Sequence, residues 1–156
     1  LEEVYRQSIR APVETTGSEK NPVMVAAGKK ARIAALNSSY TLEQHTDGKP
    51  EATRNWAMTI REFILGLDPS IQEAPKKFYV AYKMSQNIVC MEIKKQHVTL
   101  YLKLDPANVM KPPKKSRDVT NIGHYGTGDF ELVIESEEEA KEALPLIEDA
   151  YKAVGG

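Results

Sequence analysis

The spacing of apolar residues changes twice between positions 49 and 154, and this change restricts the fold more than any other feature. Over residues 49–67 apolar side chains recur at intervals of three and four, the spacing of one buried helix face. Pro50 suits the first position of that helix, and Asp68-Pro69 ends it. The predicted buried face consists of Trp56, Ile60, Phe63, Ile64 and Leu67.

After this helix the spacing falls to two, as expected for β-strands. The clearest strand candidate is 98–104, where apolar residues alternate with Thr99, Tyr101 and Lys103. Short connections separate the first three candidates, which predicts an antiparallel meander. The four predicted strands are residues 77–83, 87–94, 98–104 and 130–135.

The spacing of three and four returns after residue 135. Ser136, followed three residues later by Glu139, forms a capping box, and the acidic first turn suits the helix dipole. Pro145 is expected to kink or divide this last helix. We therefore predict an α+β fold. It is a two-layer sandwich in which a four-stranded, mainly antiparallel sheet has flanking N- and C-terminal helices on one face.

The first 40 residues are less regular. We expect residues 1–40 to be a linker or the remnant of a preceding domain, and residues 41–156 to be the α+β domain. Thr41 and Gln44 form a further capping box, in a short helix that Asp47-Gly48 ends. Because the chain begins at Leu1 and not at methionine, we expect a piece of a longer protein or a processed product. Further expectations are a helix over 1–10, a loop over 12–22, a strand over 23–27, and a helix or strand over 29–36.

Composition indicates the cellular compartment in which the protein is expected. No apolar run approaches the roughly 18 residues that a membrane span needs, and the polar first residues do not form a signal peptide. Cys90 is the single cysteine and has no partner for an internal disulfide, which fits a reducing cytosol. We expect a cytoplasmic protein with no membrane partner.

Charge is segregated along the chain although the net charge is only −1. Residues 76–115 carry +7, largely from nine lysines, whereas residues 129–156 carry −7. This segregation predicts either a basic face opposite an acidic one or mutual neutralisation of two packed segments.

The outer face of the predicted sheet combines aromatic and cationic side chains. Tyr79 and Lys83 lie on the first strand, and Tyr101 and Lys103 lie on the third. Rings stack on bases and ammonium groups neutralise phosphates, so the pattern suits DNA or RNA. The same residues are also ordinary on a solvated sheet face, and no RNA-binding consensus accompanies them.

Residues 117–129, called the glycine loop below, place three glycines around a His-Tyr pair. Glycine suits positions where the backbone has positive φ or approaches another group closely. One interpretation is a small enzyme or ligand site in which Arg117 clamps an anion and His124 acts beside Asp129. The favoured interpretation is that Arg117, Asp118 and Asp129 pair internally and that His124 caps backbone carbonyls to fix the loop. The glycines are Gly123, Gly126 and Gly128.

A metal-dependent nuclease is a less favoured alternative. Glu92 and Lys94 on the second strand, with Asp68 upstream, follow the order seen where carboxylates hold Mg²⁺ and a lysine positions water. The pattern is common by chance and lies near a tight turn. Three histidines and one cysteine form no zinc-type cluster, and we expect no metal, no cofactor and no catalytic residue.

Segments 79–83, 100–106 and 117–129 resemble an uncharacterised bacterial and archaeal family often labelled "predicted transport protein". The resemblance covers about residues 40–154. Its members carry this module behind a restriction-endonuclease-like or other DNA-associated domain. The resemblance therefore implies a non-catalytic accessory domain that binds nucleic acid or a preceding nuclease-like domain. The nuclease-type pattern of Glu92 and Lys94 is not part of the family signature. Its signature residues are Tyr82, Lys83, Lys103, Asp105, Arg117, Asp118, Gly123, His124, Gly126, Gly128 and Asp129, and all except Asp105 are our candidate binding residues.

Overall fold

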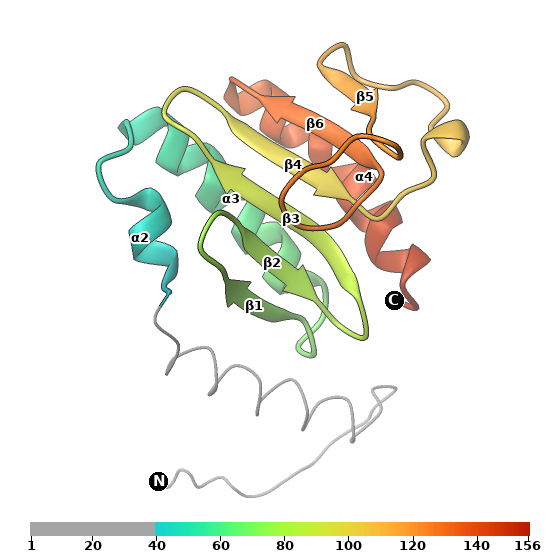
Figure 1. The fold of residues 1–156 in the computed structure, drawn as a ribbon, viewed down its shortest axis with the longest axis horizontal. Helices are drawn as coiled ribbons and strands as arrows, with labels where there is room; N and C mark the ends of the chain where they lie inside the picture. The colour runs from blue at the N-terminus through green and yellow to red at the C-terminus, as the bar shows by residue number, and fades with distance from the viewer. Residues whose placement is uncertain (1–39) are drawn as a thin grey trace, which may run out of the picture.

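A six-stranded antiparallel sheet forms the centre of the computed structural model, which describes residues 40–156 (Figure 1). The strand order is β1-β2-β3-β4-β6-β5. The prediction of an α+β fold with an antiparallel sheet and flanking helices is confirmed, but the prediction of four strands was wrong. The strands are β1 (Gln72–Pro75), β2 (Val80–Lys83), β3 (Asn87–Ile93), β4 (Val98–Leu102), β5 (Ser116–Asp118) and β6 (Phe130–Ile134).

The predicted strands form the interior of this sheet. β3 pairs with β4, with Met91 opposite Leu100 and Cys90 opposite Tyr101. β4 also pairs with β6, where Leu100 lies opposite Leu132. Alternation along β4 has the expected result, because Leu100 faces the main core and Tyr101 faces the other side of the sheet.

The two strands that sequence analysis missed lie at the edges. β1 consists of Gln-Glu-Ala-Pro and β5 of Ser-Arg-Asp, so neither has an apolar alternation. Their neighbours set their register, since Pro75 lies opposite Val80 and Arg117 opposite Glu131. Both edges are short, and β1 ends in a proline that has no backbone N–H to offer.

A polar cluster joins β1 to the helical layer. Glu73 accepts hydrogen bonds from Arg61 Nε at 2.6 Å and from the Tyr82 hydroxyl at 2.8 Å. Burial, followed by the charge of Glu73, raises the pKa of the Tyr82 hydroxyl. Tyr82 is fully buried, so this candidate binding residue lies inside the domain.

The helix α3 (Glu51–Leu67) lies along one face of the sheet, as its spacing predicts (Figure 1). Pro50 was predicted as the first helical residue but is the N-cap, one position before the observed first residue Glu51. A short helix, α2 (Leu42–Thr46), precedes it and begins with the predicted capping box of Thr41 and Gln44. The buried residues of α3 are Thr53, Ala57, Ile60 and Ile64.

The helix α4 (Glu137–Ala153) covers the same face and contacts α3 (Figure 1). The Ser136 side chain accepts a hydrogen bond from the Glu139 N–H, as predicted. Pro145 does not divide the helix, contrary to one expectation. Its side chain is exposed, and buried neighbours such as Ile147 hold the helix against the sheet on both sides of it.

The main core lies between the sheet and the two long helices. Burying one large aliphatic side chain stabilises a domain by about 1.5–3 kcal/mol, so this layer supplies most of the stability. The largest fully buried side chains of this core are Ile60, Ile64, Ile71, Val80, Tyr82, Ile88, Met91, Leu100, Leu102, Leu132, Ile134 and Ile147.

The loop between β4 and β5 contains a 3₁₀ turn, η1 (Pro106–Asn108).

One lysine of the basic segment meets the acidic start of α4. Lys115 Nζ lies 2.6 Å from Glu135 and 2.9 Å from Glu139. Burial raises the pKa of Glu139, but Lys115 and the Glu135 N–H lower it more, so the pKa lies below its ordinary value. A depressed carboxyl pKa contributes stability above the unfolded-state value of about 4.3, and that stability is lost as pH falls.

We therefore expect Lys115→Met to reduce the loss of unfolding free energy between about pH 6 and pH 3. The difference should be small, because solvent screens exposed ion pairs. Urea denaturation at both pH values measures it. Lys114→Met, which removes a neighbouring lysine without an ion pair within 4 Å in the described part of the chain, is the control. An equal effect of both variants would assign the change to net charge.

The expectations for residues 1–10, 12–22, 23–27 and 29–36 lie outside the described residues, and the division at residue 40 stays a prediction. Within residues 40–156, no helix combines the length and the apolar character that crossing a membrane requires.

Candidate functional site

The glycine loop lies across the face of the sheet opposite the two long helices (Figure 1). The Val119 N–H donates to the Asp129 carbonyl oxygen at 2.8 Å and closes the loop. Beneath it a second apolar cluster forms from Ala81, Cys90, Tyr101 and Val119. Tyr101 lies on the predicted outer face but is only 6% exposed, so this part of the face is not open for stacking.

Gly126 and Gly128 allow the loop to lie this close to the strands. Their φ angles are 78° and 131°, in the region that favours glycine. A Cβ on Gly126 would lie 2.8 Å from the Cys90 side chain, and one on Gly128 would lie 2.8 Å from the Tyr101 carbonyl carbon. Gly123 has no such neighbour within 4 Å. Two of the three glycines are therefore required by the path of the backbone.

His124 is held between the loop and the sheet. Its ring stacks on Tyr101 with centroids 3.9 Å apart and planes at 6°. Nε2 lies 2.9 Å from the Gly128 carbonyl oxygen, and Nδ1 lies 3.0 Å from that of Tyr125. Both nitrogens of His124 thus face backbone carbonyls of its own loop, the geometry of a residue that fixes the loop.

Arg117 pairs across the edge of the sheet. Its Nε donates to Glu131 at 2.7 Å, and its Nη2 donates to the other carboxylate oxygen at 3.3 Å. The Tyr101 hydroxyl bonds to Glu131 as well, and burial, then the charges of Glu92 and Glu131, raise the pKa of Tyr101. The hydrogen bond to Glu131 raises the pKa of Arg117. In the described part of the chain, no hydrogen bond or ion pair joins Arg117, His124 and Asp129 to one another.

Asp118 shapes the turn that follows β5. Its carboxylate accepts hydrogen bonds from the hydroxyl and, at 2.9 Å, the N–H of Thr120. These bonds lower the pKa of Asp118. Asp118 therefore pairs locally, which fits the favoured interpretation of the loop but without a bond to Arg117.

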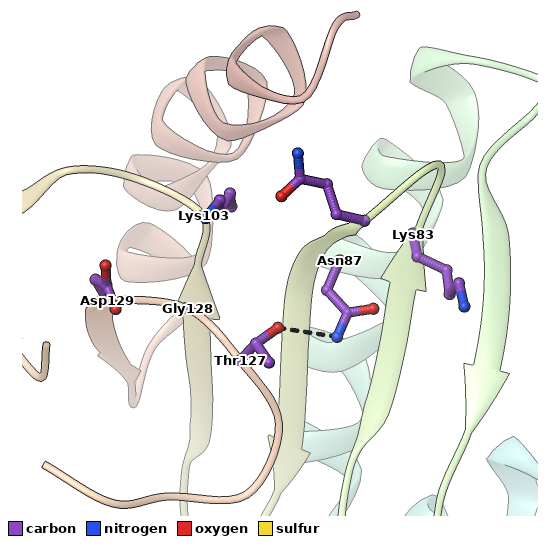
Figure 2. A pocket seen from close by; sticks show the side chains of 7 residues that line it. Lys83, Asn87, Lys103, Thr127, Gly128 and Asp129 are labelled. Atoms are coloured by element: carbon purple, nitrogen blue, oxygen red, sulfur yellow. Dashed lines mark hydrogen bonds between the residues drawn. The ribbon is translucent and has the colours of Figure 1, made fainter.

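An open depression lies beside the glycine loop at the end of the sheet where β2 ends, β3 begins and β4 ends (Figure 2). Its volume is about 410 Å³. Asn87 Nδ2 donates to Thr127 Oγ1 at 2.9 Å and attaches the loop to β3 there (Figure 2). We call it the lysine depression. Its lining residues are Lys83, Gln86, Asn87, Lys103, Thr127, Gly128 and Asp129.

Lys83 and Lys103 stand on opposite sides of Asn87 and Thr127 (Figure 2). Within residues 40–156 neither lysine lies within 4 Å of a carboxylate. Asp129 supplies one negative charge to the lining against their two positive charges. Neutralisation therefore occurs at the start of α4 through Lys115, whereas within the described residues Lys83 and Lys103 are not neutralised in this way. A basic face opposite an acidic one stays a prediction.

The three nuclease-type residues do not form one site, because Asp68 lies apart from Glu92 and Lys94. Asp68 lies beside the helices, where it accepts hydrogen bonds from Tyr151 at 2.6 Å and from Ser70 at 2.7 Å. Glu92 lies on the other face of the sheet, 3.4 Å from Lys94. Among the described residues no group of three His, Cys, Asp or Glu side chains is placed to hold a metal ion.

The structure thus sorts the candidate binding residues into three groups. Lys83, Lys103, Gly128 and Asp129 line the lysine depression, whereas Tyr82, Arg117, Asp118, His124 and Gly126 are engaged in the fold, and Gly123 is exposed. Sequence analysis did not identify the remaining lining residues as candidates, because none of them is charged or aromatic or needs a special backbone conformation. Only their place at the ends of predicted strands or in the glycine loop pointed to them. They are Gln86, Asn87 and Thr127.

Residues 42–154 match a family described as a domain of unknown function, DUF5655. An "Uncharacterized protein" from Haemophilus influenzae is 29% identical over 142 residues, which cover 90% of this chain and 47% of that protein. The chain therefore spans about half the length of this curated relative. Because residues 40–156 are fewer than the 142 matched residues, the match includes part of residues 1–39. No solved structure matches the chain.

Proposed function

Since the chain belongs to the DUF5655 family of domains of unknown function, we propose that it is a non-catalytic accessory domain that binds nucleic acid through the lysine depression. The observation that carries this proposal is the pair of lysines, 20 positions apart in sequence, on opposite sides of one open depression. Neither lysine is neutralised by a carboxylate in the described part of the chain.

The rest of the lining suits a phosphodiester backbone. Asn87 and Gln86 supply amide donors, and Thr127 supplies a hydroxyl, which are common partners of phosphate oxygens. The depression is open and therefore fits an extended polymer better than an enclosed small molecule. Contacts of this kind bind the backbone without reading the base sequence.

Lys83→Gln/Lys103→Gln is expected to weaken oligonucleotide binding by about tenfold or more at low salt. The slope of log K against log salt should fall by about 2, because two phosphate contacts no longer release counterions. Fluorescence anisotropy with single- and double-stranded DNA and RNA at a series of salt concentrations measures both quantities.

Lys111→Gln/Lys114→Gln is the matched control, because it removes the same charge from exposed lysines outside the depression. It should leave the salt slope unchanged. If the two double variants weaken binding equally, the depression is not the site. If the unmodified chain does not bind even at low salt, the proposal fails.

The domain would act as one part of a longer protein. The Haemophilus influenzae relative is about twice as long as the matched segment, and the family resemblance implies a nuclease-like partner domain. Deleting the matched segment from that relative is expected to weaken its binding to nucleic acid. Unchanged binding after the deletion would contradict an accessory role.

A further inference from the structure

We propose that the domain prefers single-stranded nucleic acid, and that Phe78 and Tyr125 form the site on which its unpaired bases stack. We call these two residues the aromatic pair. The inference rests on the proposed function, because the lysine depression would hold the phosphates of the same strand.

The aromatic pair joins two distant parts of the chain. Phe78 lies in the turn between β1 and β2, and Tyr125 lies in the glycine loop. Their rings stack with centroids 4.5 Å apart and an angle of 24° between the planes. Such a contact fixes the orientation of both rings.

Both rings remain unusually accessible. Phe78 is 51% exposed and Tyr125 is 53% exposed, and neither belongs to the main core or to the cluster under the loop. A fixed aromatic surface that water still reaches is what base stacking requires. The turn and the loop that carry the rings are both anchored, by the Lys76 N–H to the Tyr79 carbonyl oxygen at 2.7 Å and by His124 on Tyr101.

A lysine lies beside the aromatic pair, and the lysine depression lies close by in sequence. Lys77 Nζ lies 5.2 Å from the centre of the Phe78 ring. Tyr125 precedes Thr127 of the lysine depression by two residues, a distance of at most about 7 Å along the backbone. One oligonucleotide can therefore reach the aromatic pair with its bases and the depression with its phosphates.

The geometry favours a single strand over a duplex. In a duplex each base is paired and stacked on its neighbours, so its flat face is not available to a protein ring. Stacking on an aromatic side chain needs unpaired bases and tolerates any sequence. A duplex would contact the lysines alone, and we therefore expect it to bind more weakly.

The test compares three probes of equal length: a single-stranded oligonucleotide, the same strand with abasic sites throughout, and a duplex. The 156-residue chain should bind the single strand about tenfold or more tighter than the abasic strand, because stacking adds to the phosphate contacts. Phe78→Ala/Tyr125→Ala should remove this preference and leave the abasic strand and the duplex unaffected. Tyr125→Phe should retain it. DNA and RNA versions of each probe distinguish the two sources of a single strand.

Met110→Ala is the matched control, since Met110 is a large apolar side chain that is 93% exposed and lies outside the aromatic pair and the lysine depression. It should change no affinity. Equal weakening of all three probes by Phe78→Ala/Tyr125→Ala would overturn the stacking site. So would an unchanged preference for bases, as expected if the pair served only a protein contact. If Lys83→Gln/Lys103→Gln weakened binding as expected but the unmodified chain showed no base preference, the proposed function would be retained and this inference rejected.

Discussion

Gly128→Ala is expected to lower the free energy of unfolding by about 3 kcal/mol, because the added Cβ combines backbone strain with a clash. The φ angle of 131° is one that alanine rarely adopts. The new Cβ would also lie 2.9 Å from the Leu102 nitrogen and 2.8 Å from the Tyr101 carbonyl carbon. These are backbone atoms of the central strand β4 and cannot rotate away, so the loop itself must move.

Chemical denaturation of Gly128→Ala and Gly123→Ala measures the effect. Gly123 belongs to the same loop but has space around its Cα, so its alanine variant should change stability by no more than about 0.5 kcal/mol. If both variants were equally stable, the loop would not be held against the sheet as described. Thr127 and Gly128 line the lysine depression, so a displaced loop should also weaken oligonucleotide binding.

Tyr101→Ala is expected to destabilise the domain by about 3 kcal/mol. Tyr101 is 6% exposed, and truncating a buried aromatic ring leaves a cavity and removes its contacts. The ring also supports His124 at 3.9 Å, and its hydroxyl is a partner of Glu131. Its loss therefore affects both the loop and the buried carboxylate.

Two variants separate these contributions. Tyr101→Phe removes only the hydroxyl and should cost about 1 kcal/mol, since Arg117 still pairs with Glu131. A double-mutant cycle of Tyr101→Ala and His124→Ala isolates the ring stack, which should give a coupling of about 1 kcal/mol. Additive effects of the two variants would mean that the rings do not stabilise each other.

The spacing of apolar residues was sufficient to predict the central strands and the two long helices. The alternation around Leu100 and the spacing of Ile60 and Ile64 arise from side chains that face the same core, so strand and helix follow from the sequence alone. The edges could not be predicted in this way. Neither β1 nor β5 has an apolar alternation, and β5 is placed by its pairing with β6, in which Arg117 lies opposite Glu131.

The candidate site was only partly predictable for a related reason. A positive φ at Gly126 and Gly128 could be anticipated from composition, because glycine suits that conformation. The surface against which they pack could not, because Cys90 lies 36 positions from Gly126 and nothing local marks the contact. Tyr101 shows the consequence. It alternates like a solvent-facing residue, yet a distant loop covers it.

The two short edge strands also bear on how copies of the domain can associate. A sheet edge with free N–H and C=O groups is a template for strand pairing between molecules, and a long, flat, apolar edge invites aggregation. Here one edge is closed by Pro75 after four residues, and the other is three residues long and carries Arg117 and Asp118. Within the described residues, both edges therefore disfavour growth of the sheet from molecule to molecule.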